Sequence, residues 1–209
     1  MGNSLIKKVF YVPCSYWKFN YRLVKHPQDK LRLLYVGRLE KIKNLEIVLS
    51  AISWLINRKL INKSEIEFTV VGTGSYFEKY KKLIKKLNIE KIVNLKGYIS
   101  DEILNKLYKK HNIFILPSNP EPIGLVVLEA MYNNLPILCS SRAGASSYVV
   151  AKKNGEIFDP NNYIELAKKI LFYTNPKIRA IHGKNSLEIL KQNYDFKIVG
   201  NSLYNLLKQ

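Results

Sequence analysis

Short apolar runs alternate with segments of helical periodicity through most of this chain, and that alternation limits the folds open to it. The runs of strand length fall at residues 31–36, 66–71, 92–95, 113–116 and 136–139. Segments with the period of an amphipathic helix separate them, at 44–57, from about 75 to 87, at 101–109 and at 125–133. Strands that alternate with helices are typical of βαβ units. The sequence therefore predicts an α/β fold, a Rossmann-like parallel sheet with helices on both faces.

The two ends of the chain differ from this central pattern. From residue 161 onward the pattern is helical, with Pro176 marking a break and Asp195 a cap for the last helix. Residues 1–25 carry interleaved aromatic and basic side chains and no obvious helix. The chain has 209 residues and 47% apolar content, and domains of this size bury roughly 70% of their unfolded-chain surface. We interpret residues 31–209 as one domain with a helical tail, and residues 1–30 as a linker segment before it.

The charge balance restricts the partners. The formal net charge is +18, from 34 Lys and Arg against 16 Asp and Glu, which attracts anions such as nucleotides, nucleic acid or a phospholipid surface. Most of the excess positive charge comes from Lys, in a chain that is also rich in Asn and Ile. Such a bias is typical of the overall amino-acid usage of an organism and does not by itself indicate a binding surface. No nucleic-acid recognition motif accompanies the charge. We therefore expect no nucleic-acid partner.

Cysteine usage and apolar patterning bear on location. Cys14 and Cys139 lie far apart and outside any C-x-x-C pattern, which favours a reducing compartment. The first residues lack the apolar core of a signal peptide. The longest apolar run, at 123–132, is too short for a bilayer, which needs about 20 residues. We expect a cytoplasmic protein, with peripheral contact at the inner face of an anionic membrane as a further option.

Most of the usual catalytic and phosphate-binding motifs are missing. Gly72-Thr-Gly74 follows a strand, but Phe77 breaks the G-x-G-x-x-G pattern of a dinucleotide site. The three histidines are scattered along the chain, and each is better explained as a surface or packing residue. Neither a hydrolase triad nor a metal cluster can be assembled. We expect no metal site and no cofactor.

The segment at 117–131 follows an expected strand, opens a helix and carries two carboxylates. Gly124 allows close approach of the backbone to a ligand, and the N–H groups of Leu125 and Val126 can bind an anion at the start of the helix. Glu121 precedes this turn, and Glu129 lies one helical turn after Leu125. The residues alone fit equally well an ordinary βα loop with a solvated glutamate.

A resemblance separates these alternatives. Glu121 and Glu129 stand in an E-x7-E arrangement, and the sequence EPIGLVVLEAM closely resembles the donor-site motif of the retaining GT-B glycosyltransferases of family 4. Gly37-Arg38-Leu39 with Lys43, the Gly72-Thr-Gly74 turn and the segment 95–98 also resemble that family's pattern. The resemblance covers roughly residues 31–175. It implies one half of a GT-B enzyme, the carboxyl-terminal donor-binding domain.

The resemblance also implies roles for individual residues. Arg38, Lys43 and Glu121 are the expected catalytic residues, with the two cations neutralising the leaving diphosphate without metal. Glu121 is assigned to the donor-sugar hydroxyls and Glu129 to the ribose, with the Tyr98 region near the base. The expected donor-binding set is Gly37, Gly72, Gly74, Tyr98, Ile123, Gly124, Leu125, Val126 and Glu129.

Two departures from the family pattern shape the functional expectation. Ala143-Gly-Ala-Ser-Ser147 replaces a common G-G-x-P-E segment, and only about thirty residues precede the first expected strand, where the family has an acceptor-binding lobe. Residues 1–30 then represent a linker or the remnant of an interdomain segment. We expect a UDP- or GDP-sugar donor and a glycan or lipid-linked acceptor in surface polysaccharide or lipopolysaccharide synthesis. The alternative is a truncated or non-catalytic nucleotide-sugar-binding module that needs a separate amino-terminal chain.

Overall fold

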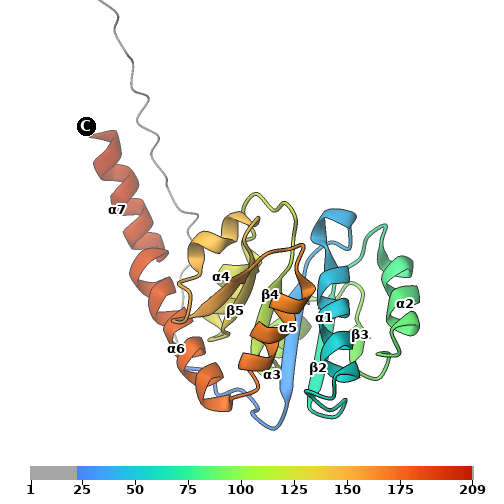
Figure 1. Ribbon diagram of the computed structural model, residues 1–209. Coiled ribbons are helices and arrows are strands. Elements are labelled where there is room, and N and C mark those ends of the chain that lie inside the picture. The colour runs from blue at the N-terminus through green and yellow to red at the C-terminus, as the bar shows by residue number, and fades with distance from the viewer. Residues whose placement is uncertain (1–22, 209) are drawn as a thin grey trace, which may run out of the picture.

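The computed structural model describes residues 23–208, which form a six-stranded parallel sheet with helices around it (Figure 1). The strand order is β3-β2-β1-β4-β5-β6, and every neighbouring pair is parallel. This confirms the predicted α/β fold. The strands are β1 (Leu31–Val36), β2 (Ile66–Val71), β3 (Val93–Leu95), β4 (Ile113–Leu116), β5 (Ile137–Ser140) and β6 (Gly155–Phe158).

Helices cover both faces of the sheet. In Figure 1, α1 and α5 lie side by side in front of the strands and α3 lies behind them, while α4 packs against α6. The helix α7 extends away from the body at the end of the chain. The helices are α1 (Leu45–Asn57), α2 (Phe77–Lys86), α3 (Asp101–Lys110), α4 (Val126–Tyr132), α5 (Tyr163–Phe172), α6 (Pro176–Asn193) and α7 (Phe196–Leu207), with two short 3-10 turns, η1 (Lys41–Lys43) and η2 (Gly144–Tyr148).

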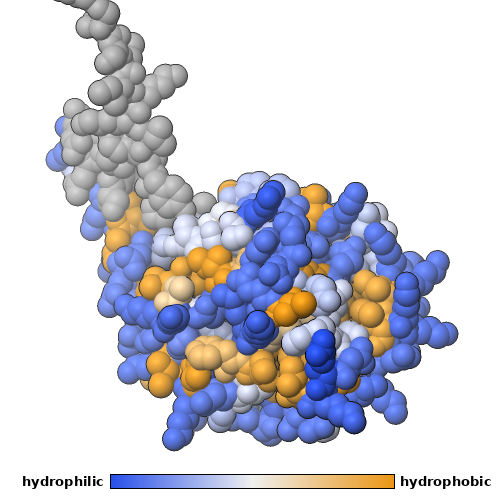
Figure 2. Space-filling model, in the orientation of Figure 1, coloured by the Kyte–Doolittle hydropathy of each residue, from blue (hydrophilic) through white to orange (hydrophobic). Residues whose placement is uncertain are grey.

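The central strands form the core because both of their faces are covered. All residues of β4 and β5 are buried, and in β1 only Arg32 and Val36 are partly exposed. A strand buried on both faces reads as a continuous apolar run, which is why these segments were predictable from sequence. The outer surface is mostly hydrophilic, with separate apolar patches on the face that Figure 2 shows.

The strand order places the functional loops. β1 is followed in sequence by β2 on one side, yet its other neighbour in the sheet is β4. The connections leaving the carboxyl ends of β1 and β4 therefore run in opposite directions and leave a crevice between them. The loop at 37–44 and the loop at 117–125 border that crevice.

Differences from the sequence prediction lie in the short elements. The strand β6 was not predicted, since Gly155–Phe158 is only four residues long and begins with glycine. β5 begins one residue later than expected and ends at Ser140. Pro176 is the first residue of α6, where its missing N–H costs no helical bond. The carboxylate of Asp195 accepts a bond from the Lys197 amide at 3.0 Å and caps α7, as predicted.

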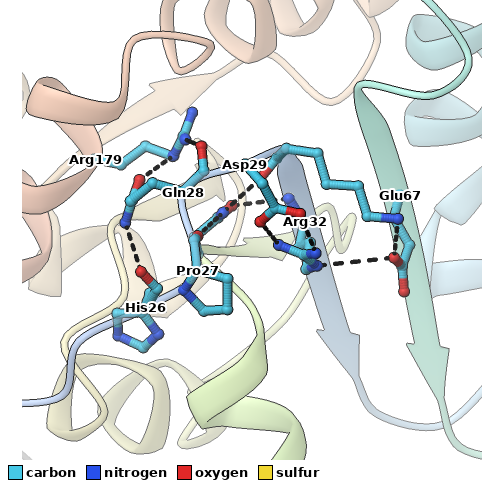
Figure 3. Close-up of polar contacts among 9 residues, drawn as sticks. His26, Pro27, Gln28, Asp29, Arg32, Glu67 and Arg179 are labelled. Carbon is cyan, nitrogen blue, oxygen red and sulfur yellow. Dashed lines mark hydrogen bonds and ion pairs between the residues drawn. The ribbon is translucent and has the colours of Figure 1, made fainter.

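Residues 23–30 pack across the amino-terminal ends of the strands (Figure 3). The amide of Asn112 donates to the carbonyl oxygens of Pro27 and Lys30 at 2.8 and 2.7 Å. The guanidinium of Arg179, which is 3% exposed, donates to both the side-chain and main-chain oxygens of Gln28 at 3.0 and 3.1 Å. This part of the expected linker is thus fixed to the domain. Residues 1–22 of that linker lie outside the described residues.

Among the side chains that bind residues 23–30, we expect Arg179 to contribute most to stability. Its guanidinium also donates to the carbonyl oxygens of Tyr173 and Thr174 at 2.6 and 3.0 Å. Arg179→Met keeps much of the side-chain bulk but removes all these donors, so we expect the free energy of unfolding to fall by about 2–4 kcal/mol. Urea denaturation measures it, with Lys177→Met on the exposed side of the same helix as the control. Equal stability of the two variants would contradict the assignment.

Candidate functional site

A cavity opens at the carboxyl ends of β1 and β4, where the strand order reverses. Its volume is about 300 Å³. It brings together the loop after β1, which carries Lys43, and the loop after β4, which carries Glu121, although the two residues are far apart in the sequence. The wall consists of Tyr35, Val36, Gly37, Lys43, Leu116, Glu121, Ile123, Gly124, Leu125 and Val126. Most of the predicted donor-site residues therefore meet in one place.

An ion pair joins the two sides of this cavity. The Nζ of Lys43 donates to Oε2 of Glu121, and the two side chains are only 12% and 15% exposed. The hydroxyl of Ser118 lies 3.5 Å from the same carboxylate oxygen. At this depth each charge compensates the other. The cavity therefore presents a cation and a carboxylate in fixed positions.

The backbone of the loop after β1 is held by bonds to its neighbours. The buried hydroxyl of Tyr35 donates to the carbonyl oxygen of Arg38 at 2.9 Å, and burial raises the pKa of that phenol. The Leu39 amide donates to the Thr73 carbonyl at 2.8 Å. The side chain of Arg38 itself is exposed and is not part of the cavity wall. Arg38 thus lies beside the cavity on a fixed loop.

Gly72 and Gly74 support the site from behind and do not line it. A Cβ on Gly72 would lie 1.9 Å from the carbonyl oxygen of Gly37, and one on Gly74 would lie 2.4 Å from that of Leu39. The Gly72 amide also donates to the Gly97 carbonyl at 2.8 Å. The two glycines therefore allow the ends of β1 and β2 to approach closely.

Gly124 forms the turn into α4. Its φ is 78°, and a Cβ there would lie 2.9 Å from both the Ala145 Cβ and the Leu116 Cδ2. Both the left-handed backbone and the lack of space require glycine. For the next two amides, those of Leu125 and Val126, residues 23–208 supply no hydrogen-bond acceptor. The predicted arrangement of exposed amides at this turn is therefore present.

Two predicted residues lie outside the cavity wall. Tyr98 is 83% exposed, in the loop after β3. Glu129 lies in α4, and its Oε2 accepts a bond from the hydroxyl of Tyr108 at 2.9 Å. Glu121 lines the cavity, whereas Glu129 lies one turn further along the helix, outside the cavity wall. Glu129 can contact only a ligand that extends beyond this cavity along α4.

The loop after β5 supports Glu121, a role that the sequence did not reveal. The Gly144 amide donates to the Glu121 carbonyl at 2.7 Å, and Ala143 pairs with Glu121 in an isolated bridge. A Cβ on Gly144 would lie 2.1 Å from the Pro122 carbonyl oxygen. This is the segment that departs from the family pattern. Its backbone, and not a side chain, positions Glu121.

The three histidines pack within the fold, as predicted from the sequence. Burial lowers the pKa of His26, His111 and His182, and each ring lies against a carbonyl or hydroxyl oxygen within 3 Å. Between residues 23 and 208, no group of three His, Cys, Asp or Glu side chains is placed to hold a metal ion. No helix in that range is both long and apolar enough to cross a membrane.

Comparison with known proteins identifies the family of this chain. The family model of glycosyl transferases group 1 matches residues 20–202. Sulfoquinovosyl transferase of Arabidopsis thaliana is 29% identical over 189 residues, which are 88% of this chain and 34% of that protein. An uncharacterized glycosyltransferase of Haemophilus influenzae is 32% identical over 160 residues, 73% of this chain and 44% of that protein. The chain spans less than half the length of these relatives.

Solved structures share the fold. Staphylococcus aureus TarM superposes with a TM-score of 0.77 at 22% identity, covering 91% of this chain and 38% of TarM. The carboxyl-terminal domain of LpcC, a group 1 glycosyl transferase of Francisella tularensis, superposes with a TM-score of 0.70 at 18% identity, covering 80% of this chain and 87% of that domain. The family model covers most of the chain and the fold agrees with it, so the chain belongs to the glycosyl transferases group 1.

Proposed function

We propose that this chain is the donor-binding domain of a retaining GT-B glycosyltransferase of family 4, which binds a UDP- or GDP-sugar. The observation that carries the proposal is the cavity between β1 and β4, where Lys43, Glu121 and the amides after Gly124 converge. A crevice at the reversal of strand order is where open α/β sheets bind nucleotides. The residues themselves supply a cation, a carboxylate and N–H donors that have no acceptor within residues 23–208.

The diphosphate fits the cationic and amide side of this cavity. As the glycosidic bond breaks, negative charge grows on the leaving diphosphate, so groups fixed around it stabilise the transition state more than the ground state. The proposal gives this role to Lys43 and to the amides of Leu125 and Val126, which line the cavity, and to Arg38 on the adjoining loop. These groups can neutralise the leaving group without a metal ion.

The side of the cavity that carries the Glu121 carboxylate is suited to the sugar of the donor. Glu121 uses Oε2 for Lys43 and Ser118, and a carboxylate has further lone pairs that accept from sugar hydroxyls. Crystal structures of relatives give parallel cases: Anabaena HepE is described with UDP and glucose, and TarM with UDP and glycan ligands. We propose a glycan or lipid-linked acceptor, in surface polysaccharide or lipopolysaccharide synthesis.

The proposed setting is the cytoplasm, with peripheral contact at the inner face of the membrane. The net charge of +18 supports attraction to an anionic lipid surface. The interleaved aromatic and basic residues at 1–25 are proposed to add to this contact, and residues 1–22 among them lie outside the described part of the chain.

Calorimetric titration with UDP, GDP and their sugars tests the proposed function. We expect binding in excess EDTA, because protein cations and amides take the place of a metal. Binding that disappears with EDTA and returns with Mg²⁺ or Mn²⁺ would contradict this electrostatic account. A complete lack of nucleotide binding under both conditions would overturn the proposed function itself.

The same titration tests whether Lys43 is the cation that binds the diphosphate. Lys43→Met removes a charge-assisted contact with the diphosphate and should weaken nucleotide binding roughly tenfold to a hundredfold. Lys41→Met is the matched control, since Lys41 lies in the same η1 turn with an exposed side chain. Equal affinities of the two variants would remove Lys43 from the site.

A second candidate function is a binding module that holds the donor and transfers nothing alone. Its support is that residues 23–208 form one six-stranded α/β unit, which carries the donor cavity. A separate amino-terminal chain would then supply the acceptor site. Transfer assays with and without such a chain separate the two candidates.

A further inference from the structure

A buried tyrosine contacts the second carboxylate of the E-x7-E segment. The hydroxyl of Tyr108, near the end of α3, donates to Oε2 of Glu129 in α4 at 2.9 Å. Tyr108 is 1% exposed. From the sequence alone, Tyr108 is only a residue of an amphipathic helix that is suited to the core, and its contact with Glu129 cannot be predicted. The contact joins two helices and ends on a predicted ligand-binding side chain.

The phenol of Tyr108 is a fixed donor. Its ring packs against Phe114 of β4, with centroids 6.2 Å apart, and Phe114 is fully buried. A glutamate side chain has three rotatable torsions and samples many positions unless a partner restrains it. Because the aromatic ring cannot move freely, its hydroxyl restricts the Glu129 carboxylate to a small region beside α3.

The backbone beneath Glu129 is fixed as well. The Glu129 amide donates to the Leu125 carbonyl at 3.4 Å, and the Asn133 side chain donates to the Glu129 carbonyl at 2.9 Å. Leu125 lines the cavity and lies one turn before Glu129 on the same helix face. The restrained carboxylate therefore lies along α4, beyond the residues that line the cavity.

We propose that Tyr108 is a positioning residue, which holds the Glu129 carboxylate where it accepts hydrogen bonds from the ribose hydroxyls of a bound nucleotide. The inference rests on the proposed function. A nucleoside lies next to its diphosphate, so the ribose follows the cavity along α4. Tyr108 then contributes to the preference for a ribonucleotide without touching it.

The test compares nucleotides that differ only in the ribose hydroxyls. Calorimetry with the full chain measures UDP and 2′,3′-dideoxy-UDP, or the corresponding guanine pair if the wild type binds GDP. Tyr108→Phe should weaken binding of the ribonucleotide about fivefold and leave the dideoxy analogue unchanged. Glu129→Gln should weaken the ribonucleotide at least as much. The double variant should bind no more weakly than Glu129→Gln, because both changes remove one coupled interaction.

Tyr173→Phe is the matched control. Tyr173 is also fully buried, and its hydroxyl lies 2.9 Å from Nδ1 of His182, in a part of the fold outside the cavity wall. The Tyr173→Phe variant should be less stable than the wild type but should bind the ribonucleotide with the same affinity. If Tyr108→Phe binds the ribonucleotide as tightly as the wild type, or loses equal affinity for both nucleotides, Tyr108 has no positioning role. The proposed function would still stand in that case, provided that the wild type binds nucleotide. Absence of nucleotide binding by the wild type overturns both.

Discussion

The purified chain should bind nucleotide sugar while transferring the sugar at least several orders of magnitude more slowly than it does together with an acceptor-binding partner. In a two-lobed transferase the second lobe orients the acceptor hydroxyl and excludes water. Orientation of this kind supplies about 7–11 kcal/mol of a barrier in favourable cases. Residues 23–208 form one α/β unit, whose cavity is open on the side of the strand ends.

Release of nucleotide from UDP- and GDP-sugars measures this difference. The assay uses lipid-linked and glycan acceptors, with the chain alone and after addition of a candidate amino-terminal chain. Activity that arises only on mixing supports a split enzyme. Efficient transfer by the chain alone would contradict the half-enzyme interpretation and make this domain sufficient for catalysis.

Gly72→Ala should produce the largest loss of stability of any single change considered. The added Cβ would lie 1.9 Å from the Gly37 carbonyl oxygen, and the φ of 133° is one that L side chains rarely adopt. Overlap with a backbone atom and a strained backbone together should lower the free energy of unfolding by about 3–5 kcal/mol. Because Gly37 lines the cavity, nucleotide affinity should fall as well.

Chemical denaturation and calorimetry give both quantities. Gly200→Ala in α7 is the control, since a Cβ there meets no atom within 4 Å. If Gly72→Ala were as stable as the control and bound nucleotide equally well, the close contact between the ends of β1 and β2 would have no energetic importance.

The sequence predicted the fold where burial leaves a continuous apolar pattern. The strands at 31–36, 66–71 and 113–116 were predicted with the bounds that the structure has, because each is covered by helices on both faces. β6 was missed because an edge strand of four residues needs little apolar character and gains its stability from pairing with β5. Local pattern carries no information on such pairing.

The sequence predicted which residues form the candidate site, but it did not predict most of the contacts between them. The segment around Glu121 and Gly124 was recognisable through its resemblance to the family 4 donor-site motif, since the residues alone also fitted an ordinary βα loop. The sequence did not indicate the Lys43–Glu121 ion pair, the Tyr108–Glu129 contact or the backbone support of Glu121 by Gly144. Each joins residues whose proximity arises only from the sheet order. The roles assigned to Arg38, Tyr98 and Glu129 stay predictions.

The ion pair across the cavity also has a consequence for folding. Lys43 and Glu121 are 78 positions apart in the chain, and they meet only while β1 and β4 are paired. A ligand held by both loops acts as a reversible cross-link between the two strands. Its binding energy adds to the stability of the native state by mass action. Occupancy should therefore protect the whole sheet from proteolysis, so that substrate supply sets the lifetime of the protein as well as its activity.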